Sequence, residues 1–316
     1  MNNLSIFATG TMRSGGSLFQ NFMSVHSDVI IFSGFVNFFR FYDERYGKMD
    51  ILAMKKILHH LKLRLKLRRN FDLPIDIIYE NLKDNPNLSY ADCYQEIMKF
   101  LRDQTNKKIW GEYVTMGWRK IPKYLEYFPD GKAIHIIRDP RAILTSFGKT
   151  SIMPEGYYLN SIFNWIDSYN YSKLFQKTLS KDRYKIIKFE DIHKNPKNEI
   201  KSICGFLDIK FQKNMIDSPK WESLFDKNFV TANISGYSKK KVYGFDKKRA
   251  TNWKNNIKEH ELFICDILLD KFNNVEESFI SNKTYSANEI AKNLEIISKY
   301  PIFYNALQKY NLDKEG

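Results

Sequence analysis

The chain has 316 residues, of which 43% are hydrophobic and 15% aromatic. This length and composition can fill a hydrophobic core, so they exclude disorder as the main state. Fifty Lys and Arg against 36 Asp and Glu leave a formal net charge of +14, which favours anionic partners such as nucleotides, acidic glycans, lipid headgroups or nucleic acid.

The apolar stretches, the N-terminal residues and the cysteine spacing exclude further classes of protein. No stretch of about eighteen apolar residues predicts a membrane span. The start, MNNLSIFATG, lacks the basic segment of a secretion signal, so we expect a cytoplasmic protein. Cys93, Cys204 and Cys265 lie far apart and outside any CxxC spacing, which argues against a disulfide scaffold and a zinc site.

Five short runs rich in β-branched and aromatic residues predict strands, with helical periodicity between most of them. They cover residues 4–10, 28–34, 108–113, 132–138 and 184–191. Strands that alternate with helices predict an α/β fold with a central parallel sheet flanked by helices.

One domain with insertions over residues 1–316 is the expected organisation, because no linker, repeat or low-complexity tract interrupts the chain. Residues 35–107 form a long predicted helical insertion, where an acceptor would bind. Residues 281–316 are predicted to form a C-terminal helical extension, which opens with Ser286 and Glu289 in capping-box spacing.

The stretch 51–71 carries seven Lys or Arg and no acid. One helical face carries Ile51, Met54, Leu58, Leu61 and Leu65, although residues 61–68 also alternate as a strand would, and we predict a helix. Three roles fit this stretch: a solvated amphipathic face, a contact for anionic lipid at the inner membrane face, or a wall that attracts an acidic acceptor.

The segment GTMRSGGS, residues 10–17, follows the first predicted strand and precedes an apolar helix, as a phosphate-binding loop does. It matches the nucleoside triphosphatase pattern GxxxxGKS/T except at Gly16, where that chemistry needs a lysine. The nearest cation is Arg13. A tight strand-to-helix connection is the alternative interpretation.

A second segment, AIHIIRDPRAILTS, predicts a strand that ends at Arg138 and a helix that begins after Asp139. Arg138 and Ser146 are both able to bind an anion, which makes this a candidate second phosphate site.

These segments resemble the sulfotransferases that use 3′-phosphoadenosine 5′-phosphosulfate (PAPS). TMRSGGSLFQNFMSVHSDV is similar to the 5′-phosphosulfate loop of that family, and IIRDPRAILTS to its 3′-phosphate motif. YKIIKFEDIHKNPKNEIKSICGFLDI is similar to the stretch that carries the family's YED and NP motifs, and ATNWKNNI to its tryptophan-containing segment. The four matches occur in family order, which implies a P-loop-like fold, PAPS as sulfuryl donor, adenosine 3′,5′-bisphosphate (PAP) as product and no metal.

The resemblance also implies roles for individual residues. The backbone from Ser14 through Gly15, Gly16 and Ser17 to Leu18 would hold the 5′-phosphosulfate, and Arg13 would be the catalytic cation. Arg138 and Ser146 would hold the 3′-phosphate. Lys247, Lys248 and Arg249 would close over the nucleotide, or form a solvated basic loop, and Trp253 would stack on adenine or belong to the core.

Glu112 is the first candidate for the catalytic base, since a hydroxyl acceptor needs a proton acceptor and many family members carry GEKTP where this chain has GEYVT. A structural carboxylate is the alternative. We therefore expect a PAPS-dependent sulfotransferase that sulfates a carbohydrate or glycolipid hydroxyl by direct in-line transfer. The rivals are a P-loop nucleotide kinase and a non-catalytic basic protein that binds nucleic acid or membrane; neither the oligomeric state nor the sulfated position follows from the sequence.

Overall fold

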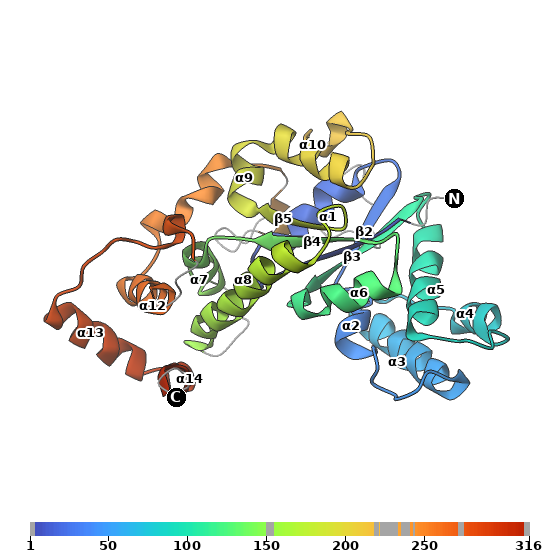
Figure 1. Ribbon diagram of the computed structural model, residues 1–316, viewed down its shortest axis with the longest axis horizontal. Helices are drawn as coiled ribbons and strands as arrows, with labels where there is room; N and C mark the ends of the chain where they lie inside the picture. The colour runs from blue at the N-terminus through green and yellow to red at the C-terminus, as the bar shows by residue number, and fades with distance from the viewer. Residues whose placement is uncertain are drawn as a thin grey trace.

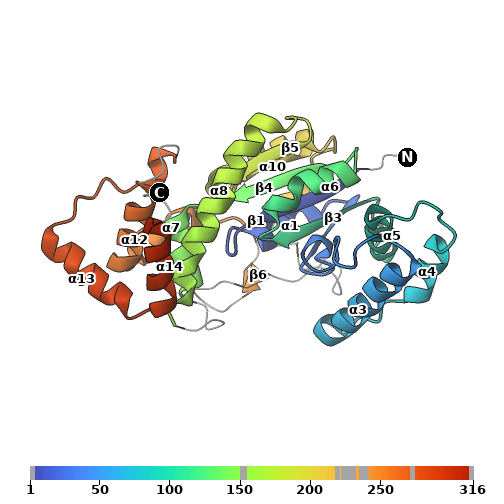
Figure 2. The same cartoon turned by 60° about the horizontal axis from the view of Figure 1, so that its bottom comes forward.

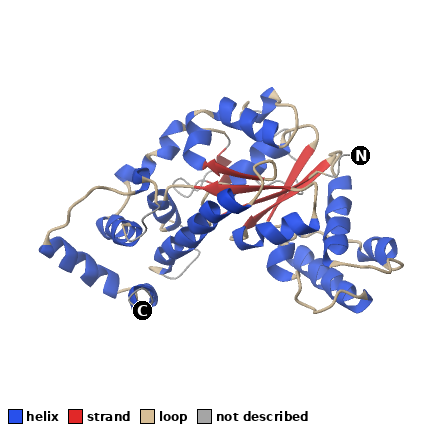
Figure 3. Ribbon diagram, viewed as in Figure 1, coloured by secondary structure: helices blue, strands red, loops and turns tan. Residues whose placement is uncertain are grey.

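A five-stranded parallel sheet lies at the centre of the molecule, with helices on both faces (Figures 1 and 3). The computed structural model describes residues 4–149, 155–217, 221, 233–234, 241–242, 244–270 and 275–312. The strand order is β2-β3-β1-β4-β5, which confirms the predicted α/β class. The strands are β1 (Ser5–Gly10), β2 (Val29–Ser33), β3 (Ile109–Thr115), β4 (Lys132–Ile137) and β5 (Tyr184–Lys188).

The last strand is shorter than predicted. Residues 184–191 were expected to be extended, but β5 ends at Lys188 and α9 (Phe189–Lys194) begins at once. The early turn carries Glu190 to the edge of β4, where its carboxylate accepts the Asp139 backbone N–H at 3.0 Å. A tertiary contact therefore decides a boundary that strand propensity leaves open.

Alternate residues of β1 face different helical layers, as the two-residue period of a strand requires. Ile6 and Ala8 pack in the same apolar cluster as Leu18 of α1 (Gly16–Ser24), whereas Phe7 belongs to the cluster on the opposite face. The first face is covered by α1, α9 and α10 (Pro196–Phe206), and the second by α6 (Ile121–Tyr127) and α8 (Ser161–Thr178), as Figure 1 shows. The sheet is therefore buried on both faces.

The insertion between β2 and β3 is helical, as predicted. It comprises α2 (Phe38–Phe41), α3 (Ile51–Arg69), α4 (Ile75–Leu82) and α5 (Tyr90–Asp103). The Asp50 side chain caps α3 by accepting the Ala53 N–H at 2.7 Å. The predicted apolar face is confirmed, because Met54, Leu58, Leu61 and Leu65 are buried.

The C-terminal helices lie at the opposite end of the molecule from α3 and α4 (Figures 1 and 2). They are α12 (Glu259–Leu269), α13 (Ala287–Ser298) and α14 (Pro301–Leu312), and they share an apolar cluster with α7 (Pro140–Phe147) and α8. The Ser286 and Glu289 capping box is present. None of the helices in the described residues has the length and apolar character needed to cross a bilayer.

Short elements complete the chain. Two-residue strands β6 (Asn233–Ile234) and β7 (Lys241–Val242) pair antiparallel. Single turns are η1 (Trp118–Lys120), η2 (Tyr157–Asn160), η3 (Lys213–Met215), η5 (Lys247–Ala250), η6 (Asn252–Asn255) and η7 (Glu277–Phe279).

The sheet order also indicates where a ligand binds. The connections that follow β1 lead to β2 and β3 on one side of it, and the chain then continues to β4 and β5 on the other side. In open α/β sheets, ligands bind beyond the carboxyl ends of the strands at such a switch point. This is the edge at which β1 meets the loop 10–17 and β4 meets Arg138.

Candidate functional site

The loop between β1 and α1 has a backbone path that only glycine permits at two positions. Gly15 has φ +112°, and a Cβ there would lie 2.4 Å from the Phe189 ring. A Cβ at Gly16 would lie 2.1 Å from the ring of Tyr113. Tyr113 therefore occupies the space that a side chain at position 16 would need, including the lysine of a nucleoside triphosphatase.

This loop presents backbone donors to the switch point. The bond from Phe19 N–H to the Gly15 carbonyl, at 3.0 Å, opens α1, so the N–H groups just before Phe19 lack acceptors within the helix. The first turn carries no acid. Ser17 is exposed, and Leu18 is buried and offers only its backbone. The loop is therefore built to accept an anion.

Ser14 differs from its neighbours in the predicted set. Its side chain is buried, and its hydroxyl lies 3.2 Å from the Tyr113 hydroxyl. Burial raises the pKa of Tyr113 to about 12, so Tyr113 is neutral at physiological pH. Ser14 thus anchors the loop on β3 with its side chain.

Three predicted residues from distant parts of the chain meet at this loop. Arg13 Nε donates to Ser146 Oγ at 3.1 Å, and Arg138 donates to the Arg13 carbonyl at 2.7 Å. Arg13 has φ 67°, so its backbone is held in the left-handed region. The structure therefore joins the two candidate phosphate segments into one cationic site at the carboxyl ends of β1 and β4.

Arg138 is oriented by its surroundings. Its guanidinium lies 4.1 Å from the centre of the Phe189 ring, and its carbonyl accepts the Trp165 indole N–H at 2.7 Å. The side chain is 7% exposed. A nearly buried cation in a fixed position suits recognition of a phosphate.

The start of α7 is fixed as predicted. The Asp139 side chain accepts the Arg141 backbone N–H, and Pro140 occupies the first turn. Asp139 also binds the Arg141 guanidinium in a bidentate pair at 2.9 and 2.7 Å. The Trp253 ring lies 4.0 Å from that guanidinium and is 9% exposed. These contacts favour the core alternative for Trp253, and adenine stacking stays a prediction.

The basic segment 247–249 lies on η5, which packs against α9. Lys247 and Lys248 are exposed and Arg249 is half-buried. The buried ring of His193 ties this turn to α9, because its Nδ1 accepts the Asp246 backbone N–H at 3.0 Å. Asp246 in turn caps η5 by accepting the Lys248 N–H.

The pKa of His193 depends on the charges around its ring. Burial, followed by the positive charges of Arg249 and Arg138, lowers the pKa of His193 to about 3. The two guanidiniums therefore both disfavour protonation of the same buried ring. The Nε2 atom of His193 has no hydrogen-bond partner in the described residues.

Glu112, the candidate base, is fully buried. Its Oε1 accepts the backbone N–H groups of Val36 at 3.1 Å and Asn37 at 2.5 Å, and its Oε2 accepts the Tyr94 hydroxyl at 2.7 Å. Burial raises the pKa of Glu112, while the Asn37 N–H and the Tyr94 hydroxyl oppose that rise. The carboxylate holds the turn that follows β2.

The position of Glu112 along the sheet also favours a structural role. Glu112 pairs with Phe7 on β1, three residues before Gly10, which is about 10 Å at the rise of a β-strand. These contacts favour the structural carboxylate for Glu112, and its role as base stays a prediction. The described residues contain no cluster of three or more His, Cys, Asp or Glu suited to a metal ion.

Several contributors to the site carry no sequence signal of their own. Phe189 and His193 lie within the KFEDIHKNP stretch, but the contacts of their side chains with Arg138 and Asp246 depend on how α9 packs. Tyr113 was noted only as a departure from the family pattern. His135 of β4 is buried in the core, where its Nδ1 lies 3.0 Å from the Tyr184 hydroxyl and its Nε2 lies 2.8 Å from the Ser168 hydroxyl.

Comparisons with known proteins relate the chain to one family. A family model described as the sulfotransferase family matches residues 5–213. A search of curated proteins found no significant sequence match. Among solved structures, the sulfotransferase domain of the Synechococcus PCC 7002 olefin synthase is 16% identical with a TM-score of 0.50, and the match covers 84% of this chain and 94% of that one.

Two further structures are more distant in shape. The sulfotransferase domain from the curacin biosynthetic pathway is 18% identical with a TM-score of 0.49, and the match covers 93% of this chain and 96% of that one. The mouse sulfotransferase SULT7A1, solved with PAP, is 12% identical with a TM-score of 0.45, and 88% of each chain is covered. At these identities the likeness to solved structures concerns the fold.

Proposed function

Because the chain belongs to the sulfotransferase family, we propose that it transfers a sulfuryl group from PAPS to a hydroxyl of a carbohydrate or glycolipid acceptor and releases PAP. The observation that carries the proposal is the hydrogen-bonded group of Arg13, Ser146 and Arg138 at the phosphate loop. It supplies two cations and a hydroxyl beside a helix N-terminus, which together fit a bisphosphorylated nucleotide.

Each part of the donor would be held by a different element. The backbone of residues 14–18 would bind the 5′-phosphosulfate. Arg138 and Ser146 would bind the 3′-phosphate, the group that distinguishes PAPS from ATP. Arg249 lies on η5, which packs against α9, and it would close over the nucleotide together with Lys247 and Lys248.

PAPS supplies an activated sulfuryl group whose leaving group is a phosphate. During in-line transfer a bond forms between the acceptor oxygen and sulfur, while the bond from sulfur to the bridging oxygen breaks and leaves its electron pair on PAP. Arg13 would neutralise the charge that develops on that bridging oxygen. The acceptor hydroxyl must also lose its proton to a base.

Glu112 is the sequence candidate for that base, but its carboxylate already accepts two backbone N–H groups and the Tyr94 hydroxyl. In our proposal Glu112 positions the turn after β2 beside the acceptor region. A direct role as base would require these bonds to open.

The charge of α3 and the free thiols support the proposed acceptor class and location. Helix α3 holds seven of the basic residues in the region where an acceptor would enter, which suits an anionic carbohydrate or a glycolipid. We propose a cytoplasmic location, since Cys93, Cys204 and Cys265 are free, buried thiols, as is usual in a reducing compartment.

Thermal unfolding with different nucleotides tests the donor site. We expect PAP to raise the Tm, AMP to raise it less and ATP with Mg²⁺ to leave it unchanged, because only a ligand that binds the folded state adds stability. Arg138→Ala should abolish the PAP effect and Ser146→Ala should weaken it. Arg45→Ala is the matched control, since Arg45 is exposed and bonds only to the Phe41 carbonyl in the described residues.

The rival functions predict other outcomes. A nucleotide kinase would be stabilised by ATP with Mg²⁺, and a non-catalytic basic protein would ignore PAP and bind nucleic acid with a steep dependence on salt. Either result would contradict the proposal. The kinase is already disfavoured because Tyr113 fills the space beside Gly16.

A further inference from the structure

The outer face of α3 carries large apolar side chains that the fold does not use. Leu52, Leu63 and Leu67 are 59%, 50% and 86% exposed. Their separations of eleven and four residues place them on one side of the helix, opposite the buried face that contains Leu61 and Leu65. Since the core side of α3 is already filled, this leucine stripe is available to an external partner.

Cations flank the leucine stripe. Lys55, Lys56 and Lys66 are exposed, with His59 between them, and α3 contains no Asp or Glu along its whole length. The described ion pairs include one from this helix, between Lys62 and Asp72. The outer face of α3 is therefore both apolar and strongly positive.

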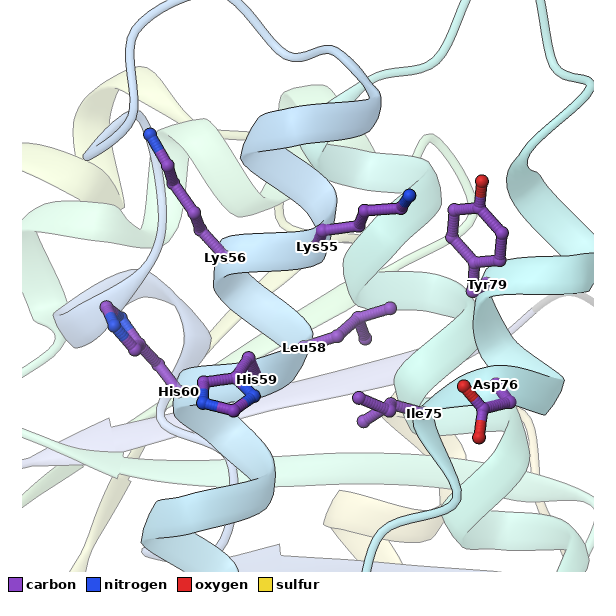
Figure 4. Close-up of a pocket in the computed structure, with 8 residues that line it drawn as sticks. All are labelled: Lys55, Lys56, Leu58, His59, His60, Ile75, Asp76 and Tyr79. Atoms are coloured by element: carbon purple, nitrogen blue, oxygen red, sulfur yellow. The ribbon is translucent and has the colours of Figure 1, made fainter.

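A cavity of about 520 Å³ opens beside this face, between α3 and α4 (Figure 4). Leu58, Ile75 and Tyr79 give it an apolar lining, and the Lys55 ammonium lies 4.7 Å from the centre of the Tyr79 ring. Asp76 is the one acid among its lining residues. Ile77 lies two residues after Ile75 on α4 and is 52% exposed, so apolar surface continues past the cavity.

Two arginines of α3 hold this helix against the body of the protein. Arg64 donates to the carbonyls of Phe35 and Val36, at 3.0 and 2.7 Å, and Arg69 donates to the Ser33 carbonyl at 3.1 Å. Ser33 is the last residue of β2, and Phe35 and Val36 lie in the turn held by Glu112. Arg64 and Arg69 thus anchor α3, while Lys55, Lys56 and Lys66 remain exposed on its outer face.

We propose that the outer face of α3, together with the cavity beside α4, docks the protein on bilayers that carry anionic headgroups. The leucine stripe would enter the boundary between headgroups and acyl chains, and Lys55, Lys56 and Lys66 would pair with lipid phosphates. The cavity would accept part of a headgroup or an acyl chain. This inference goes beyond sulfuryl transfer and does not depend on it.

Two other occupants fit the observations less well. An acidic polysaccharide would use the lysines but would leave three exposed leucines without a role. A second copy of the chain would use the leucines, but a symmetric pair would bring two acid-free cationic helices together, which costs energy. Lipid is the partner that uses both kinds of side chain.

Vesicle co-sedimentation of the full chain tests the proposal. We expect binding to vesicles of phosphatidylcholine with 30 mol % phosphatidylglycerol, little binding to phosphatidylcholine alone, and weaker binding as salt rises. Replacing Lys55, Lys56 and Lys66 with Gln should weaken partition by about fivefold per lysine. The variant Leu52→Gln, Leu63→Gln, Leu67→Gln should weaken it by at least tenfold.

The C-terminal helices offer a matched control. Ile290, Leu294 and Ile302 are 39%, 39% and 59% exposed, and the same three changes to Gln there should leave vesicle binding intact. The rise in Tm with PAP, measured on every variant, reports folding and the donor site separately from membrane docking. A variant that fails on vesicles but keeps the PAP effect supports the proposal.

Three outcomes would overturn it. One is failure of the wild-type chain to bind anionic vesicles. Another is binding that depends on the lysines but not on the leucines, together with equal affinity for a soluble sulfated polysaccharide, which would indicate a glycan surface. The third is concentration-dependent dimerisation that the leucine changes abolish, which would indicate an interface between copies.

Discussion

The two phosphate segments and the turn after β2 lie on the same sheet but use charged side chains in opposite ways. At the carboxyl ends of β1 and β4, Arg13 and Arg138 are fixed by a few bonds to Ser146 and the loop backbone, beside helix N–H groups. At the turn after β2, the Glu112 carboxylate is spent on backbone and tyrosine donors. The donor side is arranged for a ligand, whereas the buried carboxylate of Glu112 on the acceptor side holds the fold in place.

This contrast explains why the sequence predicts the phosphate site but does not identify the catalytic base. A phosphate needs backbone donors and cations at a switch point, and local sequence encodes both. An acceptor hydroxyl needs only one base at the right distance, so a carboxylate in a suitable sequence position can equally be structural.

The largest expected effect tests the donor side. Arg13→Ala should lower kcat by about a hundredfold to a thousandfold, because it removes the cation beside the leaving phosphate. Arg13→Lys should recover part of the rate. PAP release with a panel of carbohydrate and glycolipid acceptors measures both, with Arg45→Ala as control, and near-wild-type turnover by Arg13→Ala would place the catalytic cation elsewhere.

Glu112→Gln separates the two roles on the acceptor side. If Glu112 positions the turn, the change should cost about 2 to 3 kcal/mol in the free energy of unfolding, because the amide NH₂ would face groups that donate. If Glu112 is the base, the rate should instead fall by about a hundredfold to ten-thousandfold with little loss of stability. Urea unfolding and PAP release on the same sample distinguish these results.

Tyr94→Phe sharpens that test. It removes one donor to Glu112 while leaving the carboxylate itself in place, so we expect a loss of about 1 kcal/mol in stability. The rate should be close to that of the wild-type protein. A rate that falls far more than the stability would support a proton path through Tyr94 and Glu112.

Acidification should lower the stability of the fold through the buried histidines and raise it through Glu112. Burial lowers the pKa of His193 and of His135 to about 3, so each gives stability that is present above pH 6.5 and is lost as the pH falls toward 3. Each should contribute a slope of about 1.4 kcal/mol per pH unit in that window. Glu112 has a raised pKa, so its contribution to stability decreases as the pH rises through that pKa.

Urea unfolding at pH 7, 6 and 5 measures these slopes. His193→Asn keeps an acceptor for the Asp246 N–H and should reduce the loss on acidification, whereas Glu112→Gln should steepen it. An unchanged slope in His193→Asn would mean that His193 binds a proton equally in the folded and unfolded chains.

A smaller effect than that of Arg13→Ala is expected at the second phosphate contact. Ser146→Ala removes a hydroxyl that bonds to Arg13 in the ligand-free protein, and we expect about a tenfold loss of affinity for PAP, or about 1.4 kcal/mol. AMP binding should change little. Titration calorimetry with the two nucleotides checks the difference, and equal losses would assign Ser146 to a group that the nucleotides share.

Local pattern alone determined the α/β class, the strand positions apart from the end of β5, and the candidate phosphate loop. The period of apolar residues sets the strands and α3, the Asp139-Pro140 pair sets the start of α7, and Gly15 and Gly16 mark the loop that must approach an anion. These signals depend on neighbours within a few residues in the chain, so they can be read without the fold.

Only the tertiary structure decided which charges meet and which are already used. It placed Phe189 beneath Arg138, tied His193 to the turn before Lys247, closed the space at Gly16 with Tyr113, and surrounded Glu112 with donors from residues 36, 37 and 94. The physical reason is that the pKa and availability of a charged group depend on burial and on partners distant in sequence. A motif can name a carboxylate, but the packed chain determines whether it is free to react.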